Sequence, residues 1–193
     1  IDRIISAVDR SKAEGQRNRA ILETLYSCGL RVSELVNLKL SDLYFDEGFI
    51  KVEGKGSKQR LVPISPRAIN EIKLYFTDRN RIEVKKEYED FVFVSQRRGK
   101  GLSRIMIFHM IKELAQTAGI IKNISPHTFR HSFATHLLEG GANLRAIQCM
   151  LGHESIATTE IYTHIDRNML RSEIIEHHPR NIKYRKEKEE LFH

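Results

Sequence analysis

The sequence predicts a mostly helical domain that carries one small antiparallel β-sheet. Apolar residues recur at helical spacing through most of the 193 residues, whereas residues 49–64 have the pattern of two short strands joined by a glycine-bearing turn. With 40% hydrophobic and 30% charged residues, the chain has the composition of a compact domain rather than of a disordered or fibrous protein. We therefore expect one globular unit over residues 1–180, followed by a charged tail at 181–193.

The charge balance is basic, with 32 Lys and Arg residues against 25 Asp and Glu residues. Such a surplus is typical of proteins that bind a polyanion, including nucleic acids. No apolar run reaches the roughly 18 residues that span a bilayer, and the first thirty residues lack the order of a secretory signal. Cys28 and Cys149 fit neither a zinc spacing nor a secreted disulfide framework. We expect a soluble, cytoplasmic protein that does not bind membranes.

Two helices are expected near the N-terminus, at residues 18–28 and 31–38, with a tight stop between them. Gly29 stands where helices commonly end, because glycine adopts the left-handed backbone at little cost. Arg31 then falls in the first turn of the second helix. In that position its side chain can point into a cleft.

The predicted hairpin consists of strands at 49–52 and 61–64 around a turn that contains Lys55. Five basic residues and one acid, Glu53, lie between residues 51 and 67. The hairpin therefore carries a basic tip.

The remaining segments are mostly helical in their pattern. Ser125 and Pro126 form a typical helix start, with serine as the N-cap and proline at the first helical position. We predict helices at 66–76, 103–118, 126–139, 143–151, 155–164 and 166–176, a short apolar strand at 91–94, and a solvated, frayed tail at 180–190.

Three histidines in the segment 127–136 raise the possibility of a metal site. At about 100° per residue, however, His127, Arg130 and His131 share one helix face and His136 lies on the opposite face, so three imidazoles cannot meet. We therefore predict no metal. A separate apolar stripe on the helix is assigned to the core and consists of Phe129, Phe133 and Leu137. The polar face suits a phosphate, because the planar guanidinium group binds two oxygens at once.

Taken together, these segments resemble the catalytic domain of tyrosine recombinases of the phage-integrase type. The motifs that carry the resemblance are, in chain order, CGLRVSEL at 28–35, GKGSKQRLVP at 54–63, SPHTFRHSFATHLL at 125–138, LGH at 151–153 and TTEIYTH at 158–164. The resemblance covers residues 15–180, and the sequence HHPR at 177–180 is most similar to the Xer recombinases within the family. The tail beyond Asn181 is not part of the pattern.

The resemblance implies a nucleophile and a general acid. Tyr162 would attack a DNA phosphate and form a 3′-phosphotyrosine, which conserves the bond energy for resealing without a cofactor. Lys55 would protonate the departing 5′-oxygen. Taken alone, Tyr162 would be read as an ordinary half-buried tyrosine; its order with the other motif residues favours the catalytic role.

The same resemblance implies a cationic clamp on the phosphate. Arg31 and Arg130, with His127 and His153 as further donors, would stabilise the negative charge that develops on the nonbridging oxygens. Glu34 would support this clamp by orienting its groups. His131 and His136 are assigned structural roles, and His164 is a weaker site candidate.

The partners implied are double-stranded DNA at a specific recombination site and related subunits in a homo- or hetero-tetramer on two such sites. We expect an N-terminal core-binding domain that this sequence lacks. The helix at 166–176 is expected to dock on a neighbouring protomer, and the alternative is that it docks on its own domain. Basic residues expected to contact DNA phosphates are Lys58, Arg60, Arg97, Arg98, Lys100 and Arg104.

Chromosome dimer resolution of the Xer type is the favoured function. A mobile-element integrase has the same chemistry and is the main competing function, although the HHPR ending argues against it. Two less favoured functions are a type IB topoisomerase-like relaxing enzyme and a non-catalytic DNA-binding module.

Overall fold

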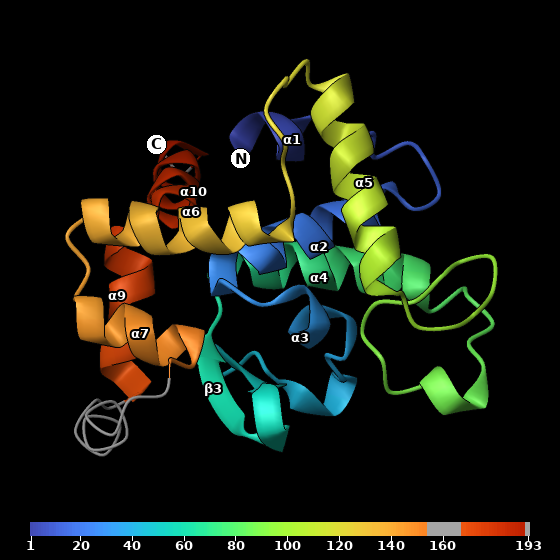
Figure 1. The fold of residues 1–193 in the computed structure, drawn as a ribbon, viewed down its shortest axis with the longest axis horizontal. Helices are drawn as coiled ribbons and strands as arrows, with labels where there is room; N and C mark the ends of the chain where they lie inside the picture. The colour runs from blue at the N-terminus through green and yellow to red at the C-terminus, as the bar shows by residue number, and fades with distance from the viewer. Residues whose placement is uncertain (154–166, 192–193) are drawn as a thin grey trace.

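A computed structural model describes residues 1–153 and 167–191, and most of this part of the chain is helical (Figure 1). The α-helices are α1 (Asp2–Ser6), α2 (Gly15–Cys28), α3 (Val32–Val36), α4 (Pro66–Arg79), α5 (Arg104–Thr117), α6 (Pro126–Glu139), α7 (Leu144–Leu151), α9 (Arg167–His177) and α10 (Pro179–Leu191). Short 3-10 helices are η1 (Leu40–Asp42), η2 (Lys55–Ser57) and η3 (Lys86–Tyr88). The predicted helix at 155–164 lies outside the described residues.

The sheet has three antiparallel strands in the order β1 (Leu43–Tyr44), β2 (Phe49–Glu53) and β3 (Gln59–Pro63). The predicted hairpin is confirmed as β2 and β3, which are joined through η2. The predicted class, mostly α with a small antiparallel sheet, is also confirmed.

The expected strand at 91–94 is wrong. Phe91 and Val94 make only single bridges, to Lys39 and Gly101. The apolar pattern was nevertheless informative about burial, because Val92, Phe93 and Val94 are all buried. The run is apolar because it enters the core, and it lacks a neighbouring strand with which to form a ladder.

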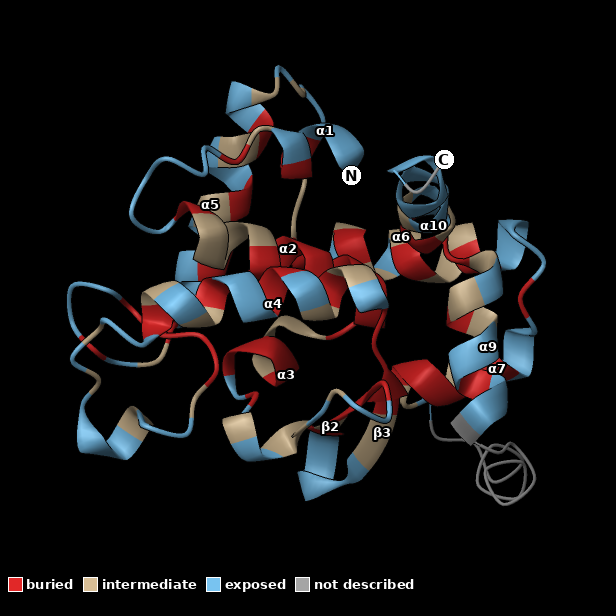
Figure 2. Cartoon of the chain, turned by 180° about the vertical axis from the view of Figure 1, so that it is seen from behind, coloured by how far each residue is buried: buried red, intermediate tan, exposed pale blue. Residues whose placement is uncertain are grey.

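Helix α2 runs through the centre of the molecule and packs on α4 and α6, and ten of its fourteen residues are buried (Figure 2). The stripe predicted on α6, consisting of Phe129, Phe133 and Leu137, is fully buried as expected. Gly29 ends α2 with φ = +64°, and a Cβ there would lie 2.4 Å from the Phe133 ring. The close contact between the end of α2 and α6 therefore requires glycine at this position.

Helix α9 docks on its own chain, against α6, α7 and β3. Leu170 and Ile174 of its apolar stripe are buried there. The backbone N–H of Asn143 donates to Glu173 at 3.0 Å, and His177 Nδ1 lies 2.7 Å from the Gly140 carbonyl oxygen. The chain itself thus provides an apolar surface for this helix, in line with docking on its own domain. Docking on a neighbouring protomer in an assembly stays a prediction.

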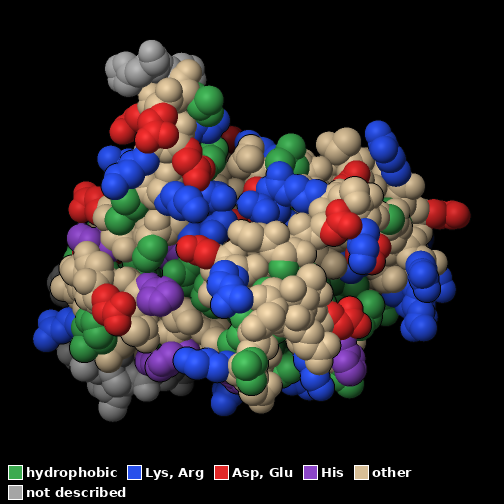
Figure 3. All heavy atoms as spheres, turned by 90° about the horizontal axis from the view of Figure 1, so that it is seen from above, with side chains coloured by type: hydrophobic (Ala, Val, Ile, Leu, Met, Phe, Trp, Pro, Cys, Tyr) green, Lys and Arg blue, Asp and Glu red, His purple; other side chains and the backbone are tan. Residues whose placement is uncertain are grey.

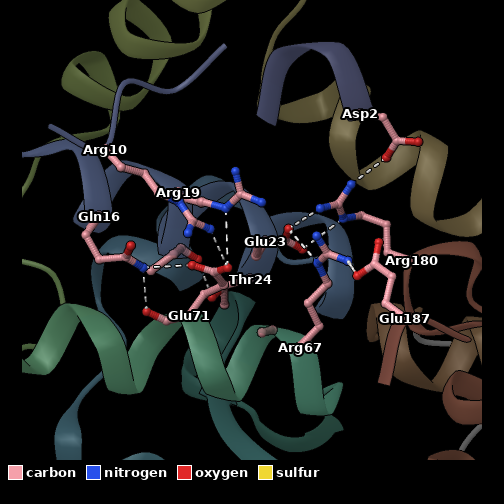
Figure 4. A network of polar contacts seen from close by, with 12 residues as sticks. Asp2, Arg10, Gln16, Arg19, Glu23, Thr24, Arg67, Glu71, Arg180 and Glu187 are labelled. Carbon is pink, nitrogen blue, oxygen red and sulfur yellow. Dashed lines mark hydrogen bonds and ion pairs between the residues drawn. The ribbon is translucent and has the colours of Figure 1, made fainter. Parts of the chain in front are cut away.

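The expected frayed tail is instead helix α10, which packs on α9 and α4. Arg180 and Asn181 are buried at its start. Arg180 contacts Glu23 of α2 and Asp2 of α1, and Arg67 of α4 contacts Glu187 at 3.6 Å (Figure 4). The start of the tail is fixed because Arg180 makes a buried ion pair with α2 and a more exposed one with α1.

Among the described helices, none is both long and apolar enough to cross a membrane.

Candidate active site

Arg31 stands at the N-cap of α3, directly after the α2 stop. Its backbone N–H donates to Glu34 Oε1 at 2.8 Å, and its guanidinium lies 3.7 Å from Glu34 Oε2. The Arg31 side chain is 30% exposed, whereas that of Glu34 is 1% exposed. The short helix thus buries the carboxylate and leaves the guanidinium accessible.

Arg130 lies in the second turn of α6 and joins two chain segments that are distant in sequence. It donates to the carbonyl oxygen of Gly29 at 2.6 Å and to that of Leu151 at 2.8 Å. Desolvation, together with the nearby charge of Arg31, lowers the pKa of Arg130 to about 10, so the group keeps its charge at neutral pH. Two carbonyl contacts hold this cation beside the segment that precedes Arg31.

His153 follows the left-handed Gly152 that ends α7. Its backbone N–H donates to the Gln148 carbonyl at 3.1 Å, and its side chain is at the surface. Partial burial and the charges of Arg130, Arg31 and Arg60 lower the pKa of His153 below its ordinary value. The imidazole is therefore neutral at pH 7 and lies in a field of positive charge.

Arg60 belongs to this cluster, which corrects the expectation that it is a surface phosphate contact. Its side chain is only 9% exposed. It donates to both oxygens of Glu34, at 2.5 and 3.1 Å, and to the Met150 carbonyl at 2.9 Å. In Figures 1 and 2, β3 lies between α3 and α7, which explains how one side chain reaches both helices.

A sequence signal for the burial of Arg60 does exist. Side chains alternate along a strand, so Arg60 shares a face with Val62, which is fully buried. The alternation indicates that Arg60 points inward, but its partners are 26 and 90 residues away in the chain.

Lys55 lies at the exposed tip of the hairpin, in η2. A cleft of about 650 Å³ runs below the hairpin, and Arg31, Glu34 and Lys55 all contribute to its lining. The lysine and the guanidinium of Arg31 therefore border the same open space.

His127 is exposed on α6, three residues before Arg130 and on the same helix face. The start of this helix is fixed by the Ser125 N–H, which donates to Thr128 Oγ1 at 3.1 Å. The structural role expected for His136 is confirmed by its contact with the Tyr26 hydroxyl at 2.5 Å. His131, in contrast, is exposed. Tyr162 and His164 lie outside the described residues.

The expected phosphate contacts other than Arg60 are exposed side chains. They are Lys58, Arg97, Arg98, Lys100 and Arg104. The face seen from above in Figure 1 carries basic side chains across its middle, with acidic side chains among them (Figure 3). Contact of these residues with DNA stays a prediction.

The site as a whole collects guanidinium groups around a single buried carboxylate. The charges of Arg31, Arg60 and Arg130 all act on His153. Arg31 and Arg60 both pair with the carboxylate of Glu34. Such a surplus of fixed donors favours an anion, and a phosphate group matches the planar geometry of guanidinium.

Comparison with known proteins points to one family. The model of the Phage integrase family matches residues 1–169. A tyrosine recombinase XerD of Pseudomonas putida is 46% identical over 180 residues, which are 93% of this chain and 60% of that protein. This similarity confirms the resemblance to Xer recombinases and places the sequence near XerD.

Two solved structures share the fold. XerA recombinase is 39% identical, with a TM-score of 0.71 over 92% of this chain and 61% of its own. The XerH site-specific recombinase, bound to its difH substrate in a pre-cleavage complex, is 30% identical, with a TM-score of 0.68 over 85% of this chain and 48% of its own. The chain thus spans about half to three-fifths of the length of these relatives.

Proposed function

Because the chain belongs to the phage integrase family, we propose that it is the catalytic part of a site-specific DNA recombinase that works through a 3′-phosphotyrosine intermediate. The observation that carries the proposal is the convergence of Arg31, Arg130 and His153 on one site. These residues come from α3, α6 and the end of α7, and the Arg130 contacts to Gly29 and Leu151 hold the three segments together. The order of the motifs in the sequence supports the same assignment.

The proposed reaction is an exchange of phosphodiester bonds. The Tyr162 oxygen attacks the phosphorus, the bond to the 5′-oxygen breaks, and the reverse attack by a 5′-hydroxyl on a second strand reseals the DNA. The number of phosphoester bonds is unchanged, so the reaction requires no energy source and no cofactor. A catalytic domain over residues 1–180 is part of this proposal.

The phosphate gains negative charge as the tyrosine attacks. Arg31 and Arg130 are already positioned as donors, and His127 and neutral His153 add further N–H groups. Because the free site has more cations than carboxylates, binding of the phosphate relieves repulsion among the guanidinium groups. Glu34 supports the clamp through its contacts with the Arg31 backbone and with Arg60.

Lys55 is proposed as the general acid for the 5′-oxygen. It lies on an exposed hairpin tip that borders the same cleft as Arg31. A lysine on such a tip can approach the scissile bond from the side opposite the nucleophile when DNA occupies the cleft.

The biological role proposed is chromosome dimer resolution in the cytoplasm, by a homo- or hetero-tetramer on two recombination sites. The support is the similarity to XerD and to the solved XerA and XerH recombinases. A core-binding domain N-terminal to these residues is also proposed, since the relatives are longer than this chain.

The test is capture of the covalent intermediate. The protein is incubated with duplexes that carry a recombination site and a nick next to the scissile phosphate, so that a short fragment diffuses away and the intermediate accumulates. Denaturing gels should show a slow protein–DNA band for the wild type and none for Tyr162→Phe. A band of equal intensity in Tyr162→Phe would contradict the proposal, as would the absence of a band from the wild type on every candidate site.

A further inference from the structure

Arg60 is more deeply buried than Arg31, with a side chain that is 9% exposed against 30% for Arg31. Its guanidinium makes two hydrogen bonds to Glu34 and one to the Met150 carbonyl. Every one of these contacts is made to the protein itself. Arg60 is therefore occupied within the fold before any DNA is bound.

Glu34 has two cations within reach, and the structure distinguishes them. Arg60 contacts both carboxylate oxygens at 2.5 and 3.1 Å, whereas the Arg31 guanidinium is 3.7 Å from the nearer oxygen. A buried carboxylate needs a paired cation, because an unpaired one is strongly destabilising. Arg60 satisfies this need.

The position of Arg60 also explains why glycine stands at two positions next to proposed catalytic residues. A Cβ at Gly54, which precedes Lys55, would lie 3.3 Å from the Arg60 guanidinium. A Cβ at Gly152, which precedes His153, would lie 3.0 Å from it. The guanidinium thus lies against the turns that carry both residues.

We propose that Arg60 is a positioning residue that neutralises Glu34 and thereby keeps the Arg31 guanidinium available for the scissile phosphate. Without Arg60, Arg31 is the nearest remaining cation and turns toward the buried carboxylate. The clamp then loses an arginine although Arg31 is still present. This inference rests on the proposed recombinase function for its kinetic consequence, but not for its structural one.

The proposal makes a prediction for the double variant. If Arg60 serves mainly to neutralise Glu34, then removal of the Glu34 charge makes Arg60 less necessary. Arg60→Met should lower the rate of DNA cleavage on the order of 10²-fold, as loss of one fixed donor does. Glu34→Gln/Arg60→Met should cleave within about tenfold of Glu34→Gln alone. Arg60→Lys, which keeps the charge, should lose less activity than Arg60→Met.

A matched control is Arg67→Met. Arg67 is 12% exposed and pairs with the 2% exposed Glu23 at 3.2 Å, so this change also breaks a buried Arg–Glu pair, but away from the site. It should lower stability without lowering the cleavage rate of the folded protein. Thermal unfolding of each variant identifies the temperature at which it is folded, and cleavage is measured there.

A second readout does not depend on DNA. Side-chain NMR of ¹⁵N-arginine, assigned with Arg31→Lys, reports how freely the Arg31 guanidinium rotates. Rotation should be fast in the wild type, slow in Arg60→Met, and fast again in Glu34→Gln/Arg60→Met. If Arg60→Met does not fold, the double variant and Arg60→Lys should both show the fast rotation of the wild type.

The outcomes separate the two claims. Slow Arg31 rotation in Arg60→Met supports the role of Arg60 even if no covalent complex forms. If Arg60→Met does not fold, fast rotation in both the double variant and Arg60→Lys supports the same role. Failure to form the covalent complex would overturn only the proposed function. Unchanged Arg31 rotation in Arg60→Met would overturn the role of Arg60. It would also be overturned if the double variant cleaved more than a hundredfold more slowly than Glu34→Gln.

Discussion

Arg180, the second residue of α10, forms a two-point ion pair with Glu23 of α2, which lies 157 residues earlier in the chain. The side chains are 7% and 2% exposed. Glu23 also accepts a hydrogen bond from Arg67 of α4 at 3.2 Å, so one buried carboxylate is shared by two arginines (Figure 4). This arrangement fixes the C-terminal helix to the centre of the fold.

The shared carboxylate predicts an asymmetry between two substitutions. Glu23→Gln leaves two largely buried guanidinium groups without their common partner and should lower the free energy of unfolding by about 3–5 kcal/mol. Arg180→Met should cost less, because Arg67 still neutralises Glu23. Urea unfolding of both variants measures the difference. Equal losses would show that Arg67 contributes nothing to the neutralisation of Glu23.

His178 predicts a pH dependence of stability. Burial, together with the charge of Arg180, lowers the pKa of His178 to about 4, while its Nε2 contacts the Tyr26 carbonyl oxygen at 3.0 Å. In the unfolded chain the pKa is about 6.5, so below that pH the unfolded state binds the proton first. Stability should therefore fall by about 3 kcal/mol as the pH decreases from 6.5 to 4, and this contribution should level off below pH 4.

The measurement is the free energy of unfolding across this pH range. His178→Gln should flatten the dependence between pH 4 and 6.5, whereas His131→Gln, at an exposed position on α6, should keep the slope of the wild type. If both variants keep the same slope, another group is responsible for the acid sensitivity.

Substitution by alanine should lower the free energy of unfolding by different amounts at two glycines that have similar backbone angles. Gly29 and Gly56 have φ of +64° and +67°, so both changes incur about 1–2 kcal/mol of left-handed strain. At Gly56 nothing lies within 4 Å of the new Cβ, whereas at Gly29 the Cβ would overlap the buried Phe133 ring. Gly29→Ala should therefore cost about 1–3 kcal/mol more in the free energy of unfolding. A similar cost at both positions would mean that α2 and α6 separate easily.

The roles of Lys55 and the arginines can be separated with a modified substrate. Replacing the 5′-oxygen at the scissile phosphate by sulfur gives a leaving group that needs no proton. Cleavage of this DNA should be restored in Lys55→Ala but remain on the order of 10²–10³-fold slow in Arg31→Ala and Arg130→Ala. Equal recovery of the three variants would remove the general-acid role of Lys55.

The sequence predicts the local features of the site well. The stop at Gly29, the helix start at Ser125–Pro126 and the hairpin around Lys55 depend on neighbouring residues, and all three occur in the structure. Strand alternation indicates that Arg60 points inward, but the buried partners of Arg60 and Arg180 could not be predicted, because each is a carboxylate far away in the chain. Charged residues are ordinarily exposed, and only the packed fold shows which of them have buried partners.

The most direct test of the account is identification of the atom that carries the DNA. The covalent complex formed on a nicked duplex is digested with nuclease and protease, and the peptides are examined by mass spectrometry. The account predicts a nucleotide joined through its 3′-phosphate to Tyr162, in a peptide that is absent from Tyr162→Phe. A nucleotide on another residue, or a linkage through the 5′-phosphate, would contradict it.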